Sequence, residues 1–271
     1  MMNIAVKIAG DFIYRSIAPT IRVAGADGKR NPRILSGLPA RLAFGLCFIL
    51  FITGCATQPR VSVKDTSRTF TTVVIDPGHG GKDSGTFSKA RRGPRVLEKV
   101  VALDVGLRVD QKLRSAGFHT VMTRRSDIFI PLETRARISN AQTNAVFVSI
   151  HFNDSPKRGI HGIETYYNST PSIPLAQKLE RNLDSMPGLS DRGVKHANFR
   201  VLRLNQYPAV LVECGFLSNK SEAVRVASAD YREHLADKIA DAIFQQRYGT
   251  NNRHSPAPDK PPAGTTVGVP N

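Results

Sequence analysis

Two histidines and two glutamates stand where the folded chain could bring them together for metal chemistry. His79 lies in the glycine-rich stretch IDPGHGG, and His151 directly follows the apolar run AVFVSI. Glu213 lies inside the apolar run PAVLVECGF, and Glu98 stands at the start of a helical pattern. Catalytic zinc is typically held by three protein ligands, often two His and one Glu, and a further carboxylate can act as general base. Together these residue types predict a catalytic zinc site.

Taken singly, each residue also has a structural interpretation. His79 could be a turn residue that tolerates an unusual backbone, and His151 could be a hydrogen-bonded core histidine. Glu98 could be a helix-start charge, which the positive end of the helix dipole favours. A carboxylate inside an apolar run, as at Glu213, must be paired or functional. The glycines of IDPGHGG lack the spacing of a phosphate-binding loop. The four residues together favour a functional site.

Strand and helix patterns alternate along the chain, which predicts a single α/β domain. Apolar, β-branched or alternating runs predict strands at 70–75, 119–124, 145–152, 160–168 and 208–216. Apolar residues at helical spacing predict helices over 97–113, 132–142, 174–183 and 231–248. We expect a mostly parallel or mixed central sheet with helices on both faces. In such sheets ligands bind beyond the carboxyl ends of the strands, so His79, His151 and Glu213 should share one rim. Glu98 can reach the same rim from its helix.

The N-terminal region has the pattern of a secretory signal. Residues 42–54 (LAFGLCFILFITG) are uncharged and follow Arg41. They are shorter than the roughly 20 apolar residues that span a membrane, and they fit the apolar part of a signal peptide. Ile52-Thr53-Gly54-Cys55 resembles a bacterial lipobox, in which the cysteine carries the lipid. Residues 1–55 are therefore predicted to be a signal region, with a lipid on Cys55 as the membrane anchor.

The rest of the chain divides into three parts by composition. Residues 56–69 are polar and predict a tether, residues 70–249 hold the predicted domain, and residues 250–271 are rich in Pro, Asn and Gly and predict a disordered tail. Cys214 is the one cysteine beyond Cys55, and no CxxC pair occurs, so a cysteine-based zinc site is excluded.

The formal net charge of +16 suits a polyanionic partner such as nucleic acid, anionic lipid or an acidic wall polymer. Nucleic acid is disfavoured, because Trp is absent, aromatic residues are only 7% of the chain, and no zinc-finger, helix-turn-helix or RNA-binding motif occurs.

The chain resembles the zinc-dependent N-acetylmuramoyl-L-alanine amidases of the amidase-3 type from about Thr72 to Tyr248. Four stretches carry the resemblance, in order: VVIDPGHGGKDSG, LEKVVALDVGLRVDQKL, TRRSDIFIPLETRARISNAQTNAVFVSIHFN and DRGVKHANFRVLRLNQYPAVLVECGFLSN. The resemblance implies that His79, Glu98 and His151 bind Zn²⁺ and that Glu213 is the catalytic glutamate. It also implies cleavage of the amide between the lactyl group of N-acetylmuramic acid and L-alanine of the stem peptide. That activity serves cell-wall remodelling or daughter-cell separation.

Several finer expectations follow from the resemblance. Peptidoglycan is the expected substrate. The residue after Cys55 is Ala56 and not Asp, which resembles the pattern of Gram-negative lipoproteins sorted to the outer membrane, so we expect the protein outside the cytoplasm, on the periplasmic side of that membrane. A protein activator is possible. Asp76 is a candidate partner that orients a ligand histidine. Phe152 replaces the alanine usual in the family, and we expect it to reshape the substrate groove. No inhibitory helix is expected between His151 and Glu213.

Two other functions remain open at this stage. A zinc peptidase that cuts within the stem peptide would share the same site. A metal-free protein that binds peptidoglycan without cutting it is disfavoured by the four intact site residues. His254 lies in the predicted tail and is expected to have no role. Four other histidines are expected to be surface or structural residues, and one of them, His196, could line the groove: His119, His161, His196 and His234.

Overall fold

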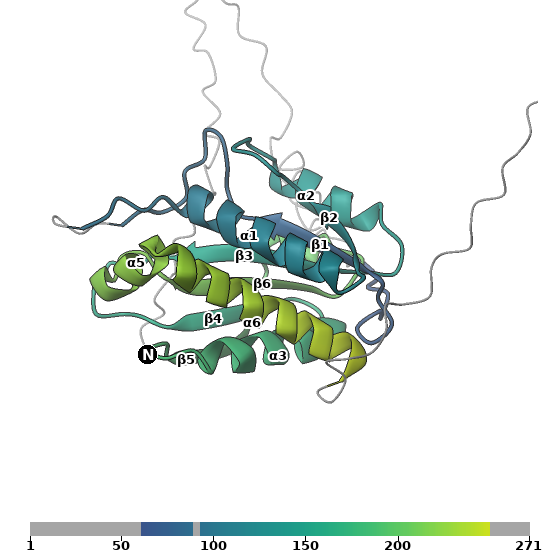
Figure 1. The fold of residues 1–271 in the computed structure, drawn as a ribbon. Coiled ribbons are helices and arrows are strands. Elements are labelled where there is room, and N and C mark those ends of the chain that lie inside the picture. Colours follow the sequence, from purple (N-terminus) through teal and green to yellow (C-terminus); the bar gives the residue numbers. More distant parts are fainter. Residues whose placement is uncertain (1–60, 89–92, 250–271) are drawn as a thin grey trace, which may run out of the picture. The chain divides into compact units, whose positions relative to one another are not determined.

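The computed structural model describes residues 61–88 and 93–249 (Figure 1). The predicted signal region, its lipobox with Cys55, and the predicted tail at 250–271 lie outside the described residues. Among the helices that are described, none is both long and apolar enough to cross a membrane.

A six-stranded mixed sheet forms the centre of the domain. Its strands are β1 (Thr72–Pro77), β2 (His119–Met122), β3 (Ala145–Asn153), β4 (Ile163–Tyr167), β5 (Asp191–His196) and β6 (Ala209–Phe216). Their spatial order is β2-β1-β3-β6-β4-β5, and only the β4–β6 pair is antiparallel. The predicted α/β class with a mostly parallel or mixed sheet is therefore confirmed. Strand β5 was not predicted, because its sequence DRGVKH is polar and has no apolar alternation.

Helices cover both faces of this sheet. They are α1 (Glu98–Ser115), α2 (Leu132–Asn140), α3 (Ile173–Asp184), α4 (Arg200–Arg203), α5 (Lys220–Ala227) and α6 (Ala229–Tyr248), and a short 3₁₀ turn at Thr170–Ser172 precedes α3. Figure 1 shows α1, α6 and α3 side by side over one face, and the contacts of α6 with both neighbours agree. Helices α2 and α4 contact each other and pack against β3 and β6. The helix α5 was not predicted, since its eight residues are too few for a clear periodic pattern.

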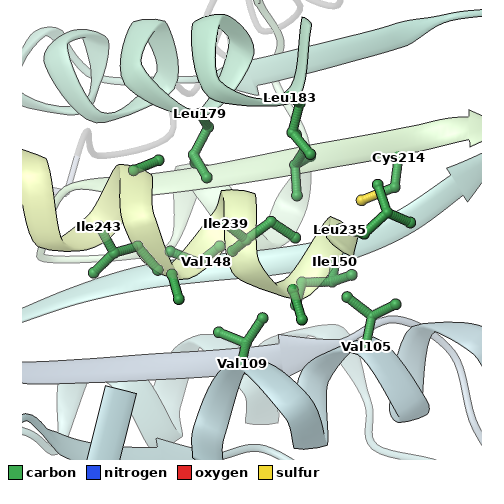
Figure 2. Packing of buried hydrophobic residues seen from close by; sticks show 14 of the residues in the cluster. Val105, Val109, Val148, Ile150, Leu179, Leu183, Cys214, Leu235, Ile239 and Ile243 are labelled. Atoms are coloured by element: carbon green, nitrogen blue, oxygen red, sulfur yellow. The ribbon is translucent and has the colours of Figure 1, made fainter. Parts of the chain in front are cut away.

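Alternation along the central strands sends side chains to two separate cores. Val146, Val148 and Ile150 of β3 belong to the larger core, under α1, α3 and α6, whereas Ala145 and Phe147 belong to the smaller one. Figure 2 shows how α6 fills the larger core: Leu235, Ile239 and Ile243 lie between Val105 and Val109 of α1 and Leu179 and Leu183 of α3. Full burial of such a side chain contributes about 1.5–3 kcal/mol. The helix spacing seen in the sequence therefore corresponds to real core contacts.

The described part of the predicted tether is held against the domain. The backbone N–H of Lys64 donates to the carbonyl of Gln206 at 2.8 Å, and the hydroxyl of Thr66 donates to the carbonyl of Ala145. Gln246 of α6 donates to the carbonyl of Ser67 at 2.9 Å. Residues 64–67 of this stretch are therefore hydrogen-bonded to the domain.

Candidate metal centre

His79 stands on a sharply turned backbone directly beyond β1. Its φ of 59° lies in the left-handed region, which few residues with a side chain adopt. Two buried arginines secure this turn. Arg124 donates to the carbonyls of Pro77 and Gly78 at 2.9 and 2.6 Å, and Arg135 donates to those of Pro77 and His79 at 2.8 and 2.6 Å. The unfavourable backbone at His79 is therefore fixed by hydrogen bonds from two neighbouring segments.

Glu98 reaches the same place as the first residue of α1. Its side chain is only 3% exposed, and its Oε2 accepts from the backbone N–H of Thr86 at 2.8 Å. Its Oε1 accepts from the backbone N–H of Phe152 at 3.1 Å. Burial raises the pKa of this carboxyl, but contacts with His151 and His79 outweigh burial and hold the pKa well below its ordinary value. Glu98 is therefore ionised and oriented toward both imidazoles.

His151, near the end of β3, completes a cluster of three side chains. One potential ligand atom from each of His79, Glu98 and His151 lies within 4.8 Å of the others. Glu98 Oε1 is 3.0 Å from His79 Nε2 and 2.9 Å from His151 Nδ1. The two imidazole planes are 76° apart, so their nitrogens approach the carboxylate from different directions. The three residues predicted as metal ligands thus come together, and two nitrogens and one oxygen make a donor set that suits zinc.

Asp83, and not Asp76, orients a histidine of this cluster. Asp83 Oδ2 lies 2.8 Å from His79 Nδ1, which leaves Nε2 as the ring nitrogen that faces Glu98. Burial lowers the pKa of His79, but the hydrogen bonds with Asp83 and Glu98 prevail and raise it to about 10. A carboxylate behind a ligand imidazole fixes its tautomer and strengthens it as a ligand.

Asp76 has a different role, which corrects the sequence-based expectation. Its Oδ1 accepts from Arg135 Nη1 at 2.8 Å and from the hydroxyl of Thr123 at 2.6 Å. Its Oδ2 accepts from the hydroxyl of Ser149 at 2.7 Å. Asp76 points to the face of the sheet where α2 packs, and its bond with Arg135 helps to hold that arginine beneath the turn at His79.

Glu213 lies beside the cluster on the adjacent strand. It pairs with His151 in the parallel register of β3 and β6, so the two side chains share one face of the sheet. The residue is 5% exposed, and its Oε2 has no hydrogen-bond partner among the described residues. Burial, followed by the negative charges of Glu98 and Glu164, raises the pKa of Glu213 well above its ordinary value. A buried carboxylate oxygen without a partner is costly unless it serves a ligand or a reaction.

Position 78 requires a glycine, because the imidazole of His151 packs directly against it. A Cβ at this position would lie 2.3 Å from Cε1 of His151, which is closer than real Cβ contacts allow. The glycine therefore makes room for an imidazole of the cluster.

Phe152 does not shape a groove. Its side chain is 1% exposed and belongs to the larger hydrophobic core, on the opposite face from His151. The expectation that it reshapes the substrate groove was therefore wrong, because neighbouring residues of a strand point to opposite faces. Within residues 61–88 and 93–249, four histidines lie outside the cluster, and all four are exposed, as predicted: His119, His161, His196 and His234.

Sequence reasoning missed three residues that support the cluster. Arg124 and Arg135 are each 2% exposed, yet nothing in their local sequence separates them from the surface arginines around them. Asp83 follows His79 by four residues in a glycine-rich loop, which was a usable signal.

Comparison with known proteins agrees with this geometry. The profile of the family described as N-acetylmuramoyl-L-alanine amidase matches residues 73–245, well over half of the chain. The chain belongs to the N-acetylmuramoyl-L-alanine amidase family. The match runs from β1 to the last turns of α6, so His79, Glu98, His151 and Glu213 all lie within the amidase domain.

Relatives of known sequence and structure share this amidase domain. The amidase LytC of Bacillus subtilis is 38% identical over 174 residues, which cover 63% of this chain and 34% of LytC. This chain therefore corresponds to about a third of that protein's length. The solved catalytic domain of the amidase CwlV from Bacillus (Paenibacillus) polymyxa is 37% identical, with a TM-score of 0.61 over 65% of this chain and 97% of that domain.

A third relative was solved together with a partner protein. The CwlD amidase from Clostridioides difficile, in complex with the GerS lipoprotein, is 28% identical. The TM-score is 0.61, and the match covers 65% of this chain and 98% of that one.

Proposed function

We propose that this chain is a zinc-dependent peptidoglycan hydrolase. It cleaves the amide bond between the lactyl group of N-acetylmuramic acid and L-alanine of the stem peptide. The observation that carries this proposal is the convergence of His79, Glu98 and His151 beside the unpartnered carboxylate oxygen of Glu213. Membership of the amidase family supports the choice of bond.

The residues present fit a zinc ion. His79, Glu98 and His151 offer two imidazole nitrogens and a carboxylate oxygen from three separate elements, and Asp83 orients one of the imidazoles. Three such ligands leave a position for water, which is the pattern of catalytic zinc sites. Zn²⁺ bound here would supply a water acidic enough to ionise near neutral pH and would polarise the scissile carbonyl.

Glu213 is the proposed general base and then general acid. It takes a proton from the attacking water and passes it to the amine of L-alanine as the C–N bond breaks. Its burial keeps bulk water away, and its free Oε2 leaves an acceptor for this proton. Glu213 would ionise beside a bound dication, because a nearby opposite charge favours the charged form of a carboxyl.

The cellular setting is also part of the proposal. The chain acts outside the cytoplasm, anchored through a lipid on Cys55 to the periplasmic side of the outer membrane, in wall remodelling or daughter-cell separation. Its support is the sequence pattern at residues 42–55. A protein activator is also part of the proposal, and its support is that the related amidase CwlD was solved in complex with a partner protein, the GerS lipoprotein.

The test is digestion of isolated peptidoglycan by the full chain, purified in a non-ionic detergent and loaded with zinc. Mass spectrometry should find free stem peptides with an unblocked L-alanine amine. The chelator-treated protein and the Glu213→Gln variant should release none. Shortened peptides from a wall whose lactyl amides stay closed would instead identify a peptidase. Wall binding without any release would identify a binding protein or an enzyme that lacks its activator.

A further inference from the structure

A second group of charged side chains lies beside Glu213, on the edge of the sheet. Glu164 of β4 stands directly opposite Glu213 in the antiparallel register of β4 and β6. His151, Glu213 and Glu164 therefore form one row across three neighbouring strands, on one face of the sheet. Glu164 is 3% exposed, so its charge must be compensated by neighbours.

Two cations from strand β5 meet this carboxylate. Arg192 Nε donates to Glu164 Oε1 at 2.6 Å, and Lys195 Nζ donates to the same oxygen at 2.8 Å. The other oxygen, Oε2, accepts from the hydroxyl of Tyr166 and from Asn153 Nδ2. Glu164 is thus fully bonded, and it holds both cations in place.

A bulge in β5 brings these two cations to the same face. Residues three apart on a regular strand point to opposite faces. Between the pairs Ile163–Asp191 and Thr165–Val194, β5 advances by one residue more than β4, and Gly193 takes a φ of 87° there. Bulges of this kind re-aim side chains and are frequent beside active sites.

The cations carry more charge than Glu164 neutralises. Arg192 and Lys195 contribute two positive charges against one negative charge, and their side chains are 32% and 40% exposed. The nearby acid Asp191 does not compensate them, because it lies on the other face with Glu180 of α3. The guanidinium of Arg192 also lies 5.3 Å from the ring centre of Phe216, which limits its motion. The result is a fixed, accessible pair of donors with one unneutralised positive charge.

We infer that Arg192 and Lys195 form a subsite for a carboxylate of the stem peptide, borne by the residue that follows L-alanine. This inference rests on the proposed function. It adds to that function the group of the stem peptide that the site recognises. A substrate whose scissile carbonyl lies at His151 and Glu213 can extend its peptide across β6 toward β4 and β5. Neighbouring strands lie about 4.8 Å apart, so β5, which is two strands away from β6, lies about 10 Å from it. The side chain of Arg192 extends from β5 over β4 to Glu164 and so covers part of this distance. Two residues of an extended peptide cover about 7 Å, which is enough to bring the carboxylate of the residue after L-alanine to Arg192 and Lys195.

The test uses two synthetic N-acetylmuramoyl peptides that differ in one group. The residue after L-alanine carries a free carboxylate in one peptide and a carboxamide in the other. The full chain in detergent, with zinc, is compared with the variants Arg192→Gln, Lys195→Gln and the double variant. Arg181→Gln, an exposed arginine of α3 on the other face, is the matched control.

The wild-type protein should prefer the carboxylate peptide, and the double variant should lose about tenfold in kcat/KM on it, as expected for a lost charge-assisted contact. On the carboxamide peptide Lys195→Gln should change by no more than about twofold, because Arg192 still neutralises Glu164. The reverse-charge variant Lys195→Glu should prefer the carboxamide peptide.

Equal losses on both peptides, with unchanged zinc content, would overturn the subsite. If the double variant fails to fold, Lys195→Gln and Lys195→Glu carry the same test, because Arg192 still neutralises Glu164.

Binding measurements separate this inference from the proposed function. In the Glu213→Gln background, calorimetry with the two peptides reports recognition without hydrolysis. A tighter Kd for the carboxylate peptide than for the carboxamide peptide, with the difference lost in the double variant, supports the subsite. This holds even if the wild-type protein cleaves neither peptide, because the absence of cleavage would contradict only the proposed function. Equal Kd values for the two peptides would overturn the subsite even if cleavage is observed.

Discussion

At the scale of single residues, the contact between Asp83 and His79 is the most direct test of the metal centre. We expect Asp83→Asn to weaken zinc binding by about 10- to 100-fold, because loss of the carboxylate frees the imidazole and makes it a poorer ligand. Competition with a chromogenic chelator measures the zinc Kd. Asp184→Asn changes an exposed aspartate of α3 in the same way and should leave the Kd unaltered. An unchanged Kd for Asp83→Asn would show that the 2.8 Å contact does not support metal binding.

The residues of the site differ in how far sequence alone could reveal them. Glu213 stood out because a carboxylate is rarely tolerated in an apolar strand, and the two histidines followed recognisable strand endings. The partner of His79 was assigned wrongly, because both Asp76 and Asp83 are close in sequence and only the fold shows which one faces the imidazole. The subsite of Arg192 and Lys195 could not be foreseen, since residues three apart share a face only because of the bulge at Gly193.

At the scale of elements, Arg135 joins helix α2 to the end of β1 and thereby supports the turn at His79. It is 2% exposed and donates to Asp76 and to three backbone carbonyls, those of Pro77, His79 and Ile130. We expect Arg135→Met to lower the free energy of unfolding by roughly 3–5 kcal/mol, because it leaves the buried Asp76 without its cation. Chemical unfolding followed by circular dichroism measures this, with the exposed Arg137→Met of the same helix as control. Equal stability of the two variants would contradict the assigned role.

The elements themselves were predictable where an apolar face is buried. The spacing of Val105 and Val109 predicted α1, and the apolar run at 208–216 predicted β6, because both pack into the larger core. Strand β5 was missed since it is an edge strand of polar residues, held by pairing with β4 and by side-chain bonds to Glu164. Pairing partners distant in sequence leave no local pattern, so an edge strand of this kind is visible only once its neighbours are placed.

At the scale of the whole molecule, the buried carboxyl of Glu180 should make folding stability depend on pH. Glu180 joins α3 to the β4–β5 edge, where its two oxygens accept from the hydroxyl of Thr165 and the backbone N–H of Gly193. Burial, followed by the contact with Asp191, raises its pKa to about 7. An acid with a raised pKa in the folded state binds its proton more tightly there than in the unfolded chain. Its contribution is therefore favourable at low pH, and stability falls as the pH rises from about 4.5, the ordinary value, through 7.

The variant Glu180→Gln removes this titration while it keeps the shape of the side chain. Its thermal midpoint should therefore vary less between pH 5 and 8 than that of the wild-type protein, and the difference should be largest at pH 8, where the wild-type carboxyl is ionised. Glu233→Gln is a suitable control, because that carboxyl is exposed and paired with Lys112, which lowers its pKa rather than raising it. Parallel pH profiles for Glu180→Gln and wild type would mean that Glu180 is ionised in the folded protein throughout this range. The edge of the sheet would then carry a second buried negative charge opposite the cations of β5.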